Sequence, residues 1–551
     1  MNLRMLAPLL WLFMLHCVAL TARPLSLSNC SKTDLTDLNE TISALSLRNC
    51  SIERLDNAFF LRYTQLLSLE LNDCGLIELD DFALHGLPLL QTLSLAYNNL
   101  TVVKSWSNEP LAALGTLDLR HNAIGALNEK SFDRYPQLQH LNLAANLIEQ
   151  IEAGIFHGLT HLRHLNLGRN RLQVIDGSMF DGLHRLSTLS LHYNAIGLVE
   201  PDAFQSNTHL RTLRLEGNRL ESVQFLRERG LSRLVSLNLS HNLLKQLPHF
   251  SFSKNYELQH LDISRNSLCE LTNDSLAGLE SLERLNLSHN TLSHMEEHSL
   301  APLTSLLQLD ISANLLTNLS SALFHSNRLL QYLNLSHNKL KVMESQLLEH
   351  LAQLTNLQLA HNKLDSVDWL QHLPSALNRQ ALSVDLSSNR LHSVDQSILN
   401  GFKLINLADN PWDCNWLIKN MLRTSPASIN FARSWPTISA ETESVLNIEG
   451  FDCFDGQKNL SIVLLDVSIV RKQSDVASSC EHATDEGNLT PPPLTWPKIR
   501  TDRFDSRSVI IWMLVAIALV FAALRWARRH VDRKDKQKNY RQATNHCNNA
   551  K

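Results

Sequence analysis

A fixed interval of 24 residues organises most of this 551-residue chain. Segments of the type Leu-x-Leu-x-x-Asn recur in one register, and Cys replaces the Asn in the first two copies. These ladder positions are Cys50, Cys74, Asn98, Asn122, Asn146, Asn170, Asn194, Asn218, Asn242, Asn266, Asn290, Asn314, Asn338 and Asn362, followed by two irregular units at Asn389 and Asn410. Repeats of roughly 20–50 residues indicate a solenoid, because each unit can bury its apolar side chains only against its neighbours.

The apolar positions of the repeat are equally regular. The residue five before the ladder position is Leu in every regular unit, and the residues three before and two after it are Leu or Ile. The apolar residues five and three before the ladder position are separated by one residue. This alternation predicts a short strand with one buried face. Ten residues after the ladder position an aromatic residue recurs, which predicts a second buried row under the convex side: Phe60, Phe132, Phe156, Phe180, Phe204, Phe252 and Phe324.

This pattern resembles the leucine-rich-repeat family, L-x-x-L-x-L-x-x-N-x-L, in its extracellular subtype of 24-residue repeats. The resemblance covers about Ile42 to Pro411. It implies an α/β solenoid: a curved horseshoe of about sixteen repeats at 42–410 with a parallel β-sheet on the concave face. Strands lie ~4.8 Å apart, so this face would be roughly 70 Å long. Such a length suits a protein partner better than a metabolite.

The two ends of the chain predict a membrane-anchored protein. Arg4, the apolar run after it and the small residues up to Ala22 are typical of a signal peptide at 1–22, with an uncleaved anchor as the alternative. The run Val509–Leu524 carries no charge and precedes a basic cluster, which predicts a spanning helix at 509–527 and a cytoplasmic tail at 528–551. A proline-rich stalk at 481–508 separates this helix from the repeats. The net charge of −4 does not favour a nucleic-acid partner.

Caps are expected at both ends of the solenoid, an N-terminal one at 23–41 and a C-terminal one at 411–480. The segment from Asn410 to Trp416 looks like the start of the family's N-P-W-x-C-x-C cap, with Trp416 at the second Cys position. The resemblance implies a disulfide between Cys414 and Cys453.

The remaining cysteines are less constrained. Cys50 and Cys74 are interpreted as buried thiols in the ladder. Cys30 has two alternatives, a disulfide with Cys50 or a free thiol. Cys269 is left unpaired by count.

Asn-x-Ser/Thr sequons are numerous, as in a secreted ectodomain. They occur at Asn29, Asn39, Asn49, Asn99, Asn238, Asn273, Asn286, Asn318, Asn334, Asn459 and Asn488. Asn238, Asn286 and Asn334 are predicted to face the concave side, where a glycan would block part of the surface. An unmodified strand asparagine is the equal alternative.

The sequence predicts neither catalysis nor a cofactor or metal site. His294 to His298 fit the zinc-peptidase pattern H-x-x-E-H, which requires both histidines on one helix. Met295 falls where other repeats place an apolar core residue, so this segment is expected to be an outer loop. His140 and His164 occupy the same concave position in adjacent repeats, about 5 Å apart. An ordinary polar surface is favoured there over a pH-sensitive or metal-binding pair.

A recognition surface is predicted on the concave side of the repeats from Asn122 to Asn218, whose side chains depart most from the consensus. Arg and Tyr are favoured interface residues, and a merely solvated face is the alternative. The candidates are Asp118, Arg120, His140, Asn142, His164, Asn166, His192, Arg214 and Glu216, with Arg169 and Tyr193 at the strand edge.

The sequence therefore predicts a type I cell-surface receptor, co-receptor or adhesion molecule that binds an extracellular or cell-surface protein and signals only through a partner in the same membrane. An adhesive or matrix-associated protein released by cleavage in the stalk is the alternative.

Overall fold

The computed structural model describes residues 24–35, 38, 40–416 and four short strands beyond them. They belong to the first of two compact units, residues 1–474. The predicted signal peptide, stalk, spanning helix and tail, and most of the C-terminal cap, lie outside the described residues. Within the described part, no helix is both long enough and apolar enough to cross a bilayer.

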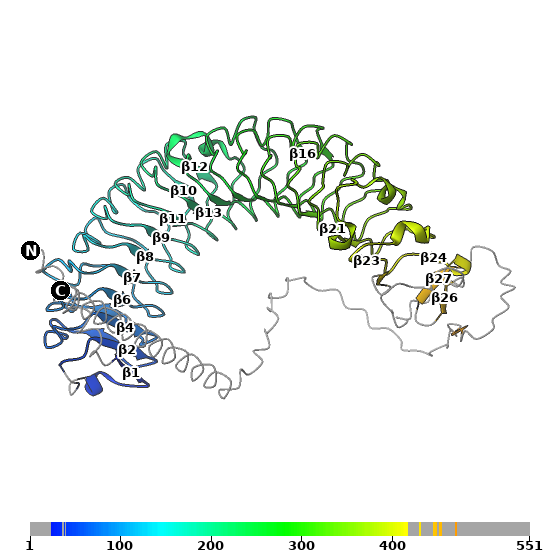
Figure 1. Cartoon of the computed structure of the whole chain (residues 1–551). Helices are drawn as coiled ribbons and strands as arrows, with labels where there is room; N and C mark the ends of the chain where they lie inside the picture. The colour runs from blue at the N-terminus through cyan, green and yellow to red at the C-terminus, as the bar shows by residue number, and fades with distance from the viewer. Residues whose placement is uncertain are drawn as a thin grey trace, which may run out of the picture. The chain divides into compact units, whose positions relative to one another are not determined.

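One parallel strand from each repeat lines the inner side of the curved array (Figure 1). Adjacent strands pair in register, so that Leu141 lies opposite Leu165 and then Leu189. The sheet has 18 strands, two more than the predicted sixteen, because each cap adds one. They are β1 (Pro24–Ser28), β2 (Ala44–Arg48), β4 (Ser68–Asn72), β6 (Thr92–Ser94), β7 (Thr116–Asp118), β8 (His140–Asn142), β9 (His164–Asn166), β11 (Thr188–Ser190), β13 (Thr212–Arg214), β14 (Ser236–Asn238), β15 (His260–Asp262), β17 (Arg284–Asn286), β19 (Gln308–Asp310), β20 (Tyr332–Asn334), β21 (Asn356–Gln358), β22 (Ser383–Asp385), β23 (Leu404–Asn406) and β25 (Ile429–Asn430).

The repeated apolar residues form the continuous core that the sequence predicts. Leu165 and Leu167 are at most 1% exposed, as are their equivalents in most repeats. The phenylalanine row is also present: the rings of Phe180 and Phe204 stack with centroids 5.9 Å apart. Where a repeat lacks this Phe, another large side chain fills the layer, such as the buried Trp106. The core is therefore a stack of similar layers rather than one central cluster.

The ladder asparagines hydrogen-bond to the backbone of their own repeat and of the preceding one. The Asn290 Nδ2 group donates to the carbonyls of Leu287 and Ile263 at 3.0 and 3.1 Å, and Oδ1 accepts from the Leu268 N–H at 3.0 Å. Asn290 is buried, so water cannot replace these bonds. The asparagine ladder therefore ties each repeat to the one before it.

The residue before each ladder position has a left-handed backbone. For example, φ is 58° at Arg169, 53° at Arg265 and 54° at His289. We call these positions the edge row, because they follow the strand directly. The edge row is Asn49, Asp73, Tyr97, His121, Ala145, Arg169, Tyr193, Gly217, His241, Arg265, His289, Ala313, His337, His361, Ser388 and Asp409. Most of these side chains are exposed.

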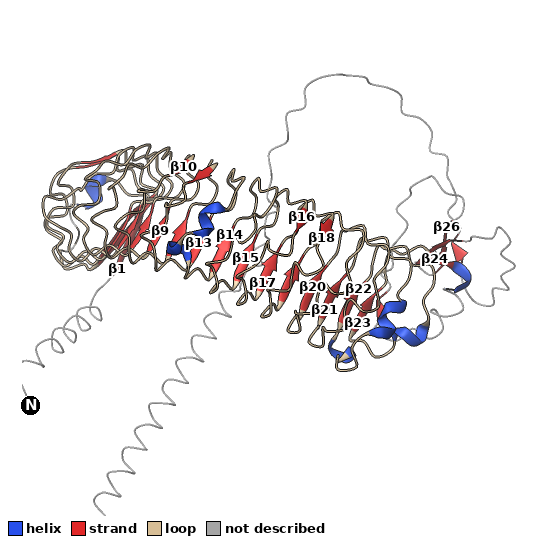
Figure 2. Ribbon diagram, turned by 90° about the horizontal axis from the view of Figure 1, so that it is seen from above, coloured by secondary structure: helices blue, strands red, loops and turns tan. Residues whose placement is uncertain are grey.

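The outer side of the array differs from the α/β expectation. Between residues 24 and 410 it consists of turns, short 3-10 helices and two-residue strands rather than α-helices (Figure 2). On the outer side the chain makes successive tight turns. In one repeat these turns are closed by hydrogen bonds from the Leu159 N–H to the Phe156 carbonyl and from the Leu162 N–H to the Leu159 carbonyl. Each repeat has only 24 residues, and these turns use the residues between one strand and the next. No room is left for a longer helix. The outer elements are β3 (Arg54–Leu55), β5 (Glu78–Leu79), β10 (Val174–Ile175), β12 (Leu198–Val199), β16 (Glu270–Leu271), β18 (His294–Met295), η2 (Lys32–Leu35), η3 (Gln224–Arg227), η4 (Arg229–Leu231), η5 (Asp368–His372), η6 (Arg379–Ala381) and η7 (Gln396–Leu399).

The N-terminal cap settles the alternatives for Cys30. Strand β1 pairs with β2, and Cys30 forms a disulfide with Cys50. The interpretation of Cys50 as a buried thiol is therefore wrong, because the cap strand brings Cys30 against it. Cys74 is a buried free thiol as expected, and Cys269 is free and exposed.

The described part of the C-terminal cap is a small sheet of β24 (Trp412–Asp413), β26 (Val445–Ile448), β27 (Phe451–Phe454) and β28 (Ile469–Val470). Cys414 is disulfide-bonded. Trp412 lies opposite Cys453 in the pairing of β24 with β27. This neighbourhood is compatible with a bridge between Cys414 and Cys453, but the Cys453 side chain lies outside the described residues, and the pairing stays a prediction.

Candidate protein-binding surface

Five adjacent strands bring the predicted recognition residues onto one surface. Strands β7, β8, β9, β11 and β13 pair in sequence, so that Asp118, Asn142, Asn166, Ser190 and Arg214 form one row across the sheet. The eleven predicted residues thus lie on or just after five neighbouring strands, and their role in binding stays a prediction. We call this group, with its two edge-row members, the concave patch.

Arg214 and Glu216 form an ion pair in which only the cation is presented to solvent. The Arg214 Nε donates to Glu216 Oε1 at 3.0 Å. The Arg214 side chain is 47% exposed, whereas that of Glu216 is 7% exposed. Glu216 Oε2 is buried and has no hydrogen-bond partner among the described residues. Arg214 therefore compensates the charge of a buried carboxylate.

A second ion pair joins Asp118, the last residue of β7, to Arg120, which follows that strand. Asp118 accepts the backbone N–H of Arg120 at 3.1 Å and lies 3.4 Å from its guanidinium. The carboxylate is 19% exposed and the guanidinium 47%. Burial raises the pKa of Asp118, which the hydrogen bond and the charge of Arg120 oppose. The guanidinium also lies over the ring of Tyr97, 5.7 Å from its centroid, and Tyr97 stacks on His121.

Two glycines make room for the centre of the patch. A Cβ at Gly168 would lie 2.2 Å from the His192 ring, and one at Gly217 would lie 2.5 Å from the Tyr193 ring. The imidazole and the phenol thus lie directly over neighbouring backbone. Arg169 also lies over the Tyr193 ring, with its guanidinium 4.9 Å from the ring centroid. These contacts fix three planar side chains relative to the sheet.

Two histidines of the patch, His164 and His192, have pKa values below the usual range of histidine. His140 and His164 stack with ring centroids 4.5 Å apart and an angle of 11°. Burial lowers the pKa of His164, and the charges of His140 and Arg163 lower it further. Burial also lowers the pKa of His192, an effect that Glu216 opposes. Parallel rings do not direct their nitrogens toward one point, so this geometry does not favour a metal between them.

The predicted concave-face sequons lie beyond the patch, and the first of them, Asn238 of β14, is directly opposite Arg214 of β13. Asn238 and Asn286 each accept the N–H of the serine two residues later, as does Asn334, whose Nδ2 also donates to Asp310. All three face the concave side beyond β13, as expected from strand alternation. Whether they carry glycans stays a prediction, and Asn39, Asn459 and Asn488 lie outside the described residues.

The peptidase-like segment is an outer element of a repeat. His294 and Met295 form β18, which pairs with β16, and Met295 is buried. The two histidines therefore do not share a helix. This confirms the assignment of the segment to the repeat.

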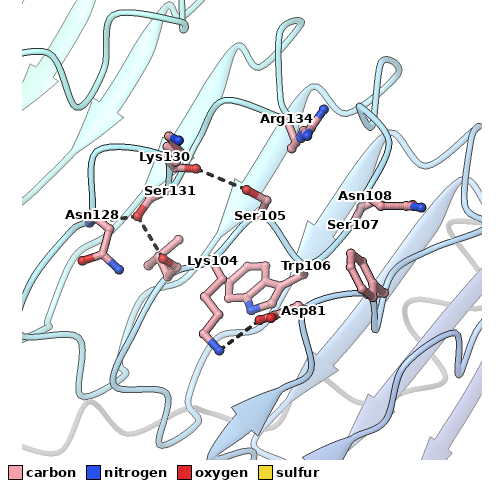
Figure 3. Close-up of a pocket in the computed structure, with 12 residues that line it drawn as sticks. Asp81, Lys104, Ser105, Trp106, Ser107, Asn108, Asn128, Lys130, Ser131 and Arg134 are labelled. Carbon is pink, nitrogen blue, oxygen red and sulfur yellow. Dashed lines mark hydrogen bonds and ion pairs between the residues drawn. The ribbon is translucent and has the colours of Figure 1, made fainter.

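The outer side has a cavity of about 390 Å³ between residues 81 and 134 (Figure 3). Buried Trp106 contributes to its wall, and Lys104 turns toward Asp81 at 3.0 Å. Ser105 and Ser131 donate to the backbone carbonyls of Lys130 and Val103. The cavity arises where Trp106 substitutes for the usual Phe, and many of its polar groups bond to one another.

The sequence prediction missed several residues that shape the concave patch. Arg163 and Arg211 precede β9 and β13 and are exposed. Gly168 and Gly217 create the space described above, and Tyr97 supports Arg120. Arg163 and Arg211 occupy the same position in two repeats, and the sequence alone could have indicated them. The importance of the glycines follows only from the side chains that lie over them.

The in-register solenoid with its asparagine ladder defines a leucine-rich-repeat protein, a class of binding scaffold rather than an enzyme family. The sequence profile of the leucine-rich-repeat family matches residues 64–124, 112–172, 160–220, 232–292, 270–316 and 304–364, which together span just over half of the chain. The chain belongs to the leucine-rich-repeat family. Comparison with curated protein sequences gave no match.

Solved structures share the fold at low sequence identity. The Drosophila Toll–Spatzle complex contains a chain with 20% identity and a TM-score of 0.59, over 71% of this chain and 57% of that one. The glycosylated form of that complex gives 20% identity and a TM-score of 0.60, over 76% and 63%. A leucine-rich-repeat protein of Leptospira interrogans has 25% identity and a TM-score of 0.55, over 62% and 85%. The chain thus spans less than two thirds of the length of both Toll chains.

Proposed function

We propose that this chain is a cell-surface recognition protein that binds a protein ligand through the concave patch. The observation that carries the proposal is the set of arginines and aromatic rings held in place on five adjacent strands. Side chains that are already fixed lose little entropy on binding, and Arg and Tyr are over-represented among the residues that dominate binding energy.

The similar solved structures support this proposal through their fold. Toll is seen in complex with Spatzle, and a plant peptide hormone receptor of similar fold, with 22% identity and a TM-score of 0.51, is seen in complex with RGF2. Both show that this solenoid can hold a protein or peptide partner. The ligand of this chain is not implied by theirs.

The proposal places the repeats outside the cell. The signal peptide at 1–22, the spanning helix at 509–527 and the basic residues after it support a type I topology. The Cys30–Cys50 disulfide supports an oxidising compartment. We further propose that signalling involves a co-receptor in the same membrane. An epitope at Lys551 should become reachable only after permeabilisation, and staining of intact cells would contradict this topology.

A binding screen with the full-length chain tests the recognition function. The chain would be displayed on transfected cells and probed with a panel of secreted and cell-surface ectodomains. Tyr193→Ala is expected to weaken the binding of a recovered ligand by at least about tenfold, the size of a moderate interface contribution. His289→Ala is the matched control, because His289 occupies the same edge-row position with nearly the same φ, 54° against 51°. Equal binding by both variants, or loss only in His289→Ala, would place the surface elsewhere.

A further inference from the structure

We infer that the partner presents an acidic protein surface to the concave patch, an inference that rests on the proposed function and adds the partner's chemistry. The starting point is the distribution of charge along the sheet. The charged residues in question lie in the seven positions that precede each ladder position. In the five repeats that end at Asn122 to Asn218, these positions contain five arginines and two carboxylates. The arginines are Arg120, Arg163, Arg169, Arg211 and Arg214, and the carboxylates are Asp118 and Glu216.

Because the two carboxylates are mostly buried, the excess of positive over negative charge is larger at the surface than in the sequence. Asp118 and Glu216 are 19% and 7% exposed, whereas their partners Arg120 and Arg214 are each 47% exposed. A guanidinium has five N–H donors. Arg214 directs Nε and one terminal nitrogen to Glu216, which leaves further donors for a ligand. Each pair therefore holds its arginine in position and presents a cation.

Arg169 is held in place by an aromatic ring rather than by a carboxylate. Its guanidinium lies over Tyr193, which in turn lies against Gly217. Planar guanidinium groups bind carboxylates in a bidentate manner, and fixing them beforehand lowers the entropic cost of that contact. The patch is therefore suited to carboxylate side chains on a folded partner.

The flanking repeats argue for a compact acidic surface rather than a long polyanion. In the same positions, the repeats from Asn242 to Asn410 contain three cations and five carboxylates, and those from Cys50 to Asn98 contain one cation and two carboxylates. Asp262, Asp310 and Asp385 lie on the concave side beyond the patch. Five strands span only about 20 Å, so a nucleic acid or sulfated polysaccharide running along the face would meet these carboxylates and be repelled.

The test compares synthetic probes on the full-length chain, purified in mild detergent and immobilised. The probes are a fluorescent peptide of about fifteen glutamates, a lysine peptide of equal length, a single-stranded oligodeoxynucleotide and a heparin oligosaccharide. We expect the glutamate peptide to bind in a salt-sensitive way and the lysine peptide not to bind. Stronger binding of the oligonucleotide or heparin than of the glutamate peptide would overturn the inference in favour of a polyanion, and failure of the glutamate peptide to bind would overturn it outright.

Two charge reversals in the same edge row locate the site. Arg169→Glu is expected to weaken glutamate-peptide binding by about tenfold or more, because like charges would face each other. Arg265→Glu is the matched control, four repeats further along with φ of 53° against 58°, and should change binding by less than about twofold. Both residues are exposed, so neither reversal creates a buried charge. Equal effects of the two variants would overturn the assignment to the concave patch.

The same pair of variants separates this inference from the proposed function. If the ectodomain screen yields a protein ligand that Tyr193→Ala weakens but Arg169→Glu does not, recognition through the patch stands and the acidic partner is wrong. If no protein ligand is found although the glutamate peptide binds at Arg169, the charge preference stands and the recognition function lacks support.

Discussion

Replacing one ladder asparagine by alanine should destabilise the array by far more than the loss of a surface amide. Asn290 is 7% exposed. Its amide accepts one backbone N–H, from Leu268, and donates to the backbone carbonyls of Ile263 and Leu287, with a longer contact of 3.4 Å to the Ser288 carbonyl. Asn290→Ala leaves the Leu268 N–H without this partner, whereas the carbonyls of Ile263 and Leu287 lose one bond each and keep those donated by Asn266 Nδ2 and Asn314 Nδ2. An unsatisfied buried polar group costs ~1–3 kcal/mol. We expect the free energy of unfolding to fall by about 2–4 kcal/mol, from about 1–3 kcal/mol for the unpaired N–H and about 0.5 kcal/mol for each carbonyl that loses one of its two bonds.

The assay is urea denaturation of the full-length chain, followed by tryptophan fluorescence, with Asn108→Ala as the control. Asn108 is exposed on the outer side, and its replacement should cost under ~0.5 kcal/mol. Asn290→Cys should fall between the two variants. The natural ladder residue Cys74 points its thiol to the carbonyls of Leu47 and Asn72 at 3.6 and 3.4 Å, which are weaker contacts. A loss below ~1 kcal/mol for Asn290→Ala would show that the ladder does not hold the repeats together.

Three further predictions follow from particular contacts. Gly168→Val should lower the free energy of unfolding by ~1–3 kcal/mol through overpacking against His192, and adding His192→Ala should recover most of that loss; no recovery would argue against this contact. Because the pKa values of His164 and His192 are lowered on folding, the unfolded chain binds more protons below about pH 6.5. Stability should therefore decrease as pH falls through that range, and a His164→Gln, His192→Gln double variant should show a flatter dependence of Tm on pH. Cys414→Ser should remove ~3–4 kcal/mol of chain-entropy stabilisation and cause retention in the secretory pathway, whereas peptide mapping that joins Cys414 to a residue other than Cys453 would contradict the proposed bridge.

The sequence by itself determined the periodic part of this protein. Because neighbouring repeats pair in register, a residue's distance from the ladder position sets its layer and its face. Leu165 and Leu167 had to be buried, and His140 had to lie beside His164, at a ring separation of 4.5 Å. The location of the concave patch follows from the same rule.

Only the tertiary structure decided how the non-repeating side chains meet. Strand alternation places Arg214 and Glu216 on one face, but only their side-chain conformations bury the carboxylate and expose the guanidinium. The space above Gly168 is occupied because His192 turns toward it from the next repeat. Cys30 lies outside the 24-residue register, so its bond to Cys50 depended on where the cap strand packs. Periodicity fixes backbone positions, whereas contacts between unlike side chains depend on rotamers and on the size of each neighbour.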